Sequence, residues 1–81
     1  MEQFEYQLAS LVTVITRDGF ENERDNLIES LEKIIKCNPE KADLIWENFE
    51  NSCNKINVVI DDNFCKHMKY YISHIKNNYE E

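Results

Sequence analysis

The sequence has very little glycine and proline, since its 81 residues contain one of each. Tight β-hairpin turns depend on glycine or on Asn-Gly and Asp-Gly pairs, so this chain has almost no turn chemistry for a sheet. It also lacks an apolar run long enough to span a bilayer. These shortages favour an all-α protein, and the length allows one compact domain covering residues 1–81.

Basic residues are also scarce, because 9 Lys and Arg stand against 16 Asp and Glu, and the formal net charge is −7. Nucleic acids and anionic membranes bind proteins through clustered lysines and arginines. We therefore expect no direct binding to nucleic acid and no membrane association. A basic protein partner is favoured instead, or a role as a decoy for nucleic acid.

The three cysteines, Cys37, Cys53 and Cys65, form an odd set without Cys-x-x-Cys spacing. We expect buried free thiols in a reducing cytoplasm, and the acidic amino-terminal residues do not resemble a secretory signal. His67 and His74 lie seven residues apart on one helical face, about 10 Å from each other, which is too far to share a metal ion. Neither a phosphate-binding glycine loop nor a nucleophile elbow is present, so we expect no metal, no cofactor and no enzymatic activity.

Apolar residues recur at helical spacing in four segments of the chain. We expect helices from Glu2 to Thr16, between Asn22 and Asn38, from Pro39 to about Ser52, and from Asp61 or Asp62 to a frayed polar tail that begins at Asn77. Short connections between the helices favour a compact antiparallel four-helix bundle.

The expected helix boundaries depend on a few residues. Gly19 is placed to end the first helix in a left-handed conformation. Asn22 and Asn38 are placed to cap the second and third helices, with Pro39 at the first helical position of the third. The chain contains ten asparagines, a bias that composition alone does not explain.

The stretch Ile56 to Ile60 is short, β-branched and apolar, which suits a buried strand or an extended segment better than a helix. A single strand without a partner cannot form a sheet. We therefore expect a short apolar linker that plugs the core between the third and fourth helices.

The acidic residues of the third helix form a stripe that consists of Glu40, Asp43, Glu47 and Glu50. No Lys or Arg follows any of these acids at the four-residue spacing that would pair with it. Trp46 lies at the edge of this stripe toward the buried face. An ordinary solvated face explains many such stripes, but unpaired acids beside a large aromatic residue also resemble an interface rim with its anchor. In the second helix, Glu29 and Glu32 have Lys33 and Lys36 as favourably placed partners. The residues expected to bind a partner are Asp25, Glu29, Glu40, Asp43, Trp46, Glu47 and Glu50.

Two segments, Leu11 to Ile15 and Asn38 to Trp46, resemble the colicin and pyocin nuclease immunity proteins. Those proteins combine a Leu-Val-Thr segment in the first helix with an acidic second helix, a proline, and a third helix that reads Asp-Leu-Ile followed by two tyrosines. In this chain Asp43 begins the matching Asp-Leu-Ile, while Trp46 and Glu47 stand in place of the tyrosines. The resemblance implies a four-helix fold that binds a basic nuclease domain.

The family's third helix is very short and precedes a loop rich in Gly, Pro and Asp, whereas this chain predicts a long third helix without glycine. We therefore keep the broader resemblance, to small acidic immunity proteins of bacterial toxin systems. It implies a cytoplasmic inhibitor that neutralises a basic toxin domain. Two alternatives stay open: a phage-type nucleic-acid mimic that blocks a host protein, and a self-associating helical bundle, in which the chain forms a homo-oligomer.

Overall fold

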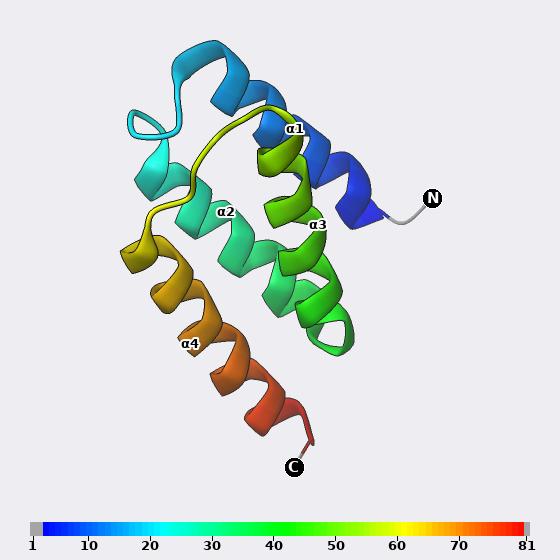
Figure 1. Ribbon diagram of the computed structural model, residues 1–81. Coiled ribbons are helices and arrows are strands. Elements are labelled where there is room, and N and C mark those ends of the chain that lie inside the picture. The colour runs from blue at the N-terminus through cyan, green and yellow to red at the C-terminus, as the bar shows by residue number, and fades with distance from the viewer. Residues whose placement is uncertain (1–2, 81) are drawn as a thin grey trace.

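The computed structural model describes residues 3–80, and the side chains of residues 3–78 (Figure 1). This part of the chain is all-helical and contains no strand, which confirms the predicted fold class. Its elements are α1 (Gln3–Asp18), α2 (Arg24–Cys37), the short 3₁₀ helix η1 (Pro39–Lys41), α3 (Ala42–Lys55) and α4 (Asp62–Glu80). The third helix thus begins later than predicted, because η1 takes up its expected first turn. The fourth continues through the tail that was expected to fray.

The helices pack into a compact unit with a Cα radius of gyration of 12.1 Å. Helix α1 packs mainly on α3, and α2 mainly on α4. Figure 1 shows α2 and α4 side by side and running in the same direction. Every buried side chain within residues 3–78 is apolar. None of the described helices is long and apolar enough to cross a membrane.

Phe64 stands at the centre of an aromatic cluster that joins three parts of the chain. Its ring centroid lies 5.0 Å from that of Phe20 in the α1–α2 connection. It lies 6.2 Å from Trp46 and 6.1 Å from Phe49, both in α3. Such pairs contribute about 0.5–1.5 kcal/mol beyond the area they bury. The cluster therefore fixes the start of α4 against α3 and against the preceding loop.

Asparagine side chains have no role in starting the next helix here, and instead bond the carbonyl ends of the first two helices, the first of which ends at a glycine. Gly19 has a φ of 90° and its N–H donates to the carbonyl oxygen of Ile15 at 2.9 Å, so it ends α1 as predicted. Asn22 donates from Nδ2 to the Asp18 carbonyl at 2.8 Å, and Asn38 donates from Nδ2 to the Ile34 carbonyl at 2.8 Å. The predicted cap of α2 at Asn22 is therefore wrong, since Glu23 holds that position. Asn38 does stand at the N-cap of η1 with Pro39 as its first residue, as predicted, but its side chain bonds the carbonyl end of α2 and not the new helix.

Asn57 ends α3 in a left-handed conformation, with a φ of 60°. Its N–H donates to the Asn54 carbonyl at 3.1 Å, and the N–H of Val58 donates to the Cys53 carbonyl at 2.9 Å. These two bonds are the Schellman arrangement, in which glycine is the usual residue at the left-handed position. Asparagine is the next most tolerant residue there, so the helix ends without glycine.

The segment from Ile56 to Ile60 is the apolar linker that the sequence predicts. Ile56, Val58 and Ile60 are partly buried against the core. Val59 lies between them and is 87% exposed. The linker thus packs one set of alternate side chains inward and leaves one large apolar side chain in water.

Asp61 caps α4, as one of the two predicted candidates. Its Oδ1 accepts a hydrogen bond from the backbone N–H of Phe64 at 2.8 Å. Arg24 donates to the same carboxylate from Nε at 3.1 Å and from Nη2 at 3.3 Å. Both contacts favour the ionised acid, and they lower the pKa of Asp61.

The three cysteines are free thiols in different environments. Cys53 is buried, Cys65 is half-buried and Cys37 is exposed near the end of α2. The predicted burial of all three is therefore wrong for Cys37, whose position on α2 points away from the buried stripe. Burial, followed by the nearby charge of Glu50, raises the pKa of the Cys53 thiol to about 11.

Candidate functional site

The acids predicted to bind a partner begin in η1 and continue along α3. Glu40 lies in the 3₁₀ helix, whose three residues per turn break the α-helical spacing that aligned it with the others. Asp43 and Glu47 are exposed on α3, and Glu50 is half-buried. The stripe is therefore shorter than its sequence spacing suggests.

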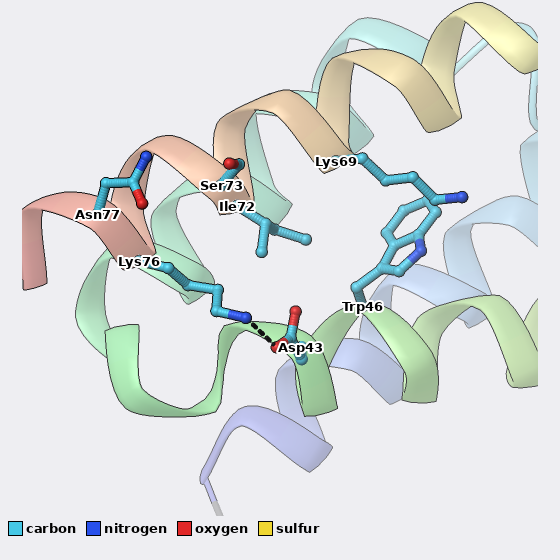
Figure 2. Close-up of a pocket in the computed structure, with 7 residues that line it drawn as sticks. All are labelled: Asp43, Trp46, Lys69, Ile72, Ser73, Lys76 and Asn77. Carbon is cyan, nitrogen blue, oxygen red and sulfur yellow. Dashed lines mark hydrogen bonds and ion pairs between the residues drawn. The ribbon is translucent and has the colours of Figure 1, made fainter. Parts of the chain in front are cut away.

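Asp43 has a basic partner on another helix. Lys76 of α4 donates from Nζ to Asp43 Oδ2 at 2.7 Å (Figure 2). The prediction that this acid is unpaired is wrong, because helical spacing reveals only partners within the same helix. The side chain of Lys76 is 43% exposed and that of Asp43 is 70% exposed, so the pair adds at most about 1 kcal/mol to stability. The positive charge of Lys76 does cancel most of the negative charge of Asp43 at this part of the surface.

Trp46 is a core residue, as its place on the predicted apolar face of α3 requires. It is 7% exposed and its ring centroid lies 6.0 Å from that of Phe49. An interface anchor inserts an exposed side chain into a pocket of the partner. Trp46 presents too little surface to act in that way without leaving the aromatic cluster.

One edge of Trp46 lines a groove of about 570 Å³ between α3 and α4 (Figure 2). Figure 2 shows Lys69 and Lys76 reaching from α4 across this groove, toward Trp46 and Asp43 respectively. The charged residues that line it are thus two lysines and one aspartate. The groove does not have the negative charge that a basic partner needs.

On α2, Asp25 and Glu29 are both exposed. Glu29 pairs with Lys33, whose Nζ lies 3.4 Å from Glu29 Oε1, as the spacing predicts. This pair neutralises part of the surface of α2.

Two residues of α4 contact Glu32 of α2 and hold it toward α4. His67 Nε2 lies 2.8 Å from Glu32 Oε2, and the hydroxyl of Tyr71 donates to the Glu32 carbonyl at 3.3 Å. The other histidine, His74, lies 3.1 Å from the amide nitrogen of Asn78. Within the described residues no three His, Cys, Asp or Glu side chains gather as a metal site would require.

A second acidic part of the surface contributed only Asp25 to the predicted site residues. It consists of the two segments 17–25 and 57–62, which contain six acidic residues and two arginines and so carry −4 of the net charge of −7. They meet in space, because Arg24 bonds Asp61 and the rings of Phe20 and Phe64 are in contact. A signal was present in the sequence, where acids gather in the two longest connections and at the helix ends beside them, but only the fold brings these segments together.

Comparison with models of protein families, with curated proteins and with solved structures gives no match for this chain. The candidate site is therefore interpreted from its own charge and geometry.

Proposed function

We propose that this chain is a cytoplasmic protein inhibitor of the immunity or antitoxin type, which binds a basic toxin domain and blocks it. The toxin domain is most consistent with a nuclease, because nucleases carry the positive surface that binds phosphates. The observation that supports the proposal is the position of the charge. Within residues 3–78 every buried side chain is apolar, so the charged side chains of this part of the chain, in which acids outnumber bases, lie at the surface where a partner can meet them.

The negative surface charge mainly affects how the chain recognises its partner. An acidic surface accelerates association with a basic partner and disfavours partners of the same sign. Inhibition then needs only that the bound chain covers the toxin's substrate-binding surface. No chemical step by the inhibitor is involved.

The predicted partner-binding residues contribute unequally to this proposal. Glu40, Glu47 and Asp25 are exposed acids, and they are the members of the set best placed to meet a cation. Glu29 shares its charge with Lys33, and Asp43 shares its charge with Lys76. The antiparallel arrangement is proposed only for consecutive helices that short connections join, since α2 and α4 pack on each other and run in the same direction.

The test is affinity capture from the producing cell, followed by assay of the purified partner. We expect a basic protein in a complex that weakens as salt concentration rises, and we expect its activity to be lost when the chain is added. Recovery of no basic partner would contradict the proposal, as would a partner that stays fully active in the complex. A captured nucleic-acid-binding host protein that DNA displaces would favour the mimic instead.

A further inference from the structure

The end of the molecule formed by the α1–α2 connection and the α3–α4 linker has a groove that is lined by both apolar and polar residues. Its volume is about 450 Å³, and Phe20, Val58 and Val59 supply its apolar lining. Val59 is the most exposed large apolar side chain of the described residues, at 87%. An exposed valine is ordinary by itself, but here it adjoins two further apolar side chains across a hollow.

Acids surround this groove. Glu21 and Asp61 lie in its lining, and Asp18 and Asp62 are exposed immediately beside lining residues in the chain. The bases of the two segments are already engaged, since Arg17 bonds Asp18 at 3.0 Å and Arg24 bonds Asp61 at 3.1 Å. The net charge of this end is therefore negative after its internal pairs are counted.

We propose that this groove, referred to below as the linker groove, is the docking surface for a basic protein segment that inserts one apolar side chain between flanking lysines or arginines. Charge complementarity selects this occupant. A second copy of the chain carries the same negative end and would be repelled, and an anionic ligand would be repelled in the same way. The inference rests on the proposed function and assigns it a surface other than the α3 stripe.

The linker that carries Val59 is held by the fold at both of its ends. The left-handed Asn57 turns the chain out of α3, and the Asp61 cap starts α4 immediately after Ile60. Ile56, Val58 and Ile60 anchor the linker to the core on either side of Val59. Val59 is thus presented by a segment that is fixed at both ends, which lowers the ordering cost of binding.

The probe for the experiment is a short synthetic peptide with a central leucine flanked on each side by lysines. Its comparison peptide has serine in place of the leucine. Each is titrated at low ionic strength into the full-length chain labelled with ¹⁵N, and amide shifts are followed residue by residue. We expect the shifts to concentrate at residues 19–22 and 58–62, with binding about tenfold tighter for the leucine peptide, because its side chain is buried in the groove.

Val59→Ser and Leu44→Ser form a matched pair of variants. Leu44 is 46% exposed on α3, so its variant removes an exposed apolar side chain of similar kind from a different surface. We expect Val59→Ser to abolish the preference for the leucine peptide and Leu44→Ser to retain it. Both variants should keep one cooperative unfolding transition in urea, which checks that the fold is intact, with a lower midpoint for Leu44→Ser because part of the leucine side chain is buried.

Shifts centred on α3, equal affinity for the two peptides, or an unchanged preference in Val59→Ser would each overturn the linker groove. These results are distinct from failure of the proposed function. If a toxin is captured and inhibited while the shifts lie on α3, only the location is wrong. If the shifts lie at the linker groove and no basic protein is inhibited, the docking surface stands and the inhibitor role fails.

Discussion

The end of α3 gives a prediction in which glycine and alanine exchange their usual order. Asn57 has a φ of 60°, a conformation that costs an ordinary L-residue roughly 1–2 kcal/mol and costs glycine almost nothing. Glycine loses part of this advantage, because its greater freedom in the unfolded chain lowers the free energy of unfolding by about 0.5–1 kcal/mol relative to alanine. We therefore expect Asn57→Gly to be more stable than Asn57→Ala by about 1 kcal/mol.

Thermal unfolding measures this difference directly. In a domain of this size, 1 kcal/mol corresponds to a shift in Tm of about 4–8 °C. Asn51 is the matched control, because it is exposed within α3 and has ordinary helical geometry. There Asn51→Ala should be more stable than Asn51→Gly by about 1 kcal/mol. If Asn57→Ala is as stable as Asn57→Gly, position 57 does not have the left-handed conformation that turns the chain into the linker.

Three further predictions concern the core, the α4 cap and the thiols. Phe64→Ala should lower the free energy of unfolding by about 3–5 kcal/mol, a large part of the roughly 4–12 kcal/mol expected for this length, and a loss below about 1 kcal/mol in urea unfolding would contradict the aromatic hub. Arg24 and a backbone N–H lower the pKa of Asp61 below its ordinary value of 3.8, so the ionised carboxylate stabilises the fold above that pH, and this contribution is lost as pH falls through the folded pKa. Asp61→Asn should therefore flatten the fall of Tm below about pH 4, and identical pH profiles would rule out the cap. A thiol reagent at mildly alkaline pH should label exposed Cys37 quickly and buried Cys53 only on unfolding, and equal rates by mass spectrometry would show that Cys53 is accessible.

The helical fold was predictable because its information is local. Apolar spacing located the four helices, and the β-branched stretch from Ile56 to Ile60 indicated the linker. Helix ends were less accessible to sequence reasoning. A lone asparagine between two helices can cap either one, and both Asn22 and Asn38 bond the carbonyl end of the helix before them.

The candidate site was harder to predict because it depends on contacts between distant segments. The partner of Asp43 comes from α4, 33 residues further along the chain. The negative end arises only when the α1–α2 connection meets the α3–α4 linker. Summing charge along single helices therefore selected the α3 stripe and, apart from Asp25, missed the end of the molecule where the two connections meet.

Binding of a basic partner through the linker groove can be measured as the affinity of the captured complex after charge reversal. Glu21→Lys changes an exposed acid in the groove lining, and Glu47→Lys makes the same change of charge on α3. We expect Glu21→Lys to weaken binding by about tenfold or more and Glu47→Lys to have a much smaller effect, measured by titration calorimetry at one salt concentration. Equal effects, or a larger loss for Glu47→Lys, would contradict binding through the linker groove.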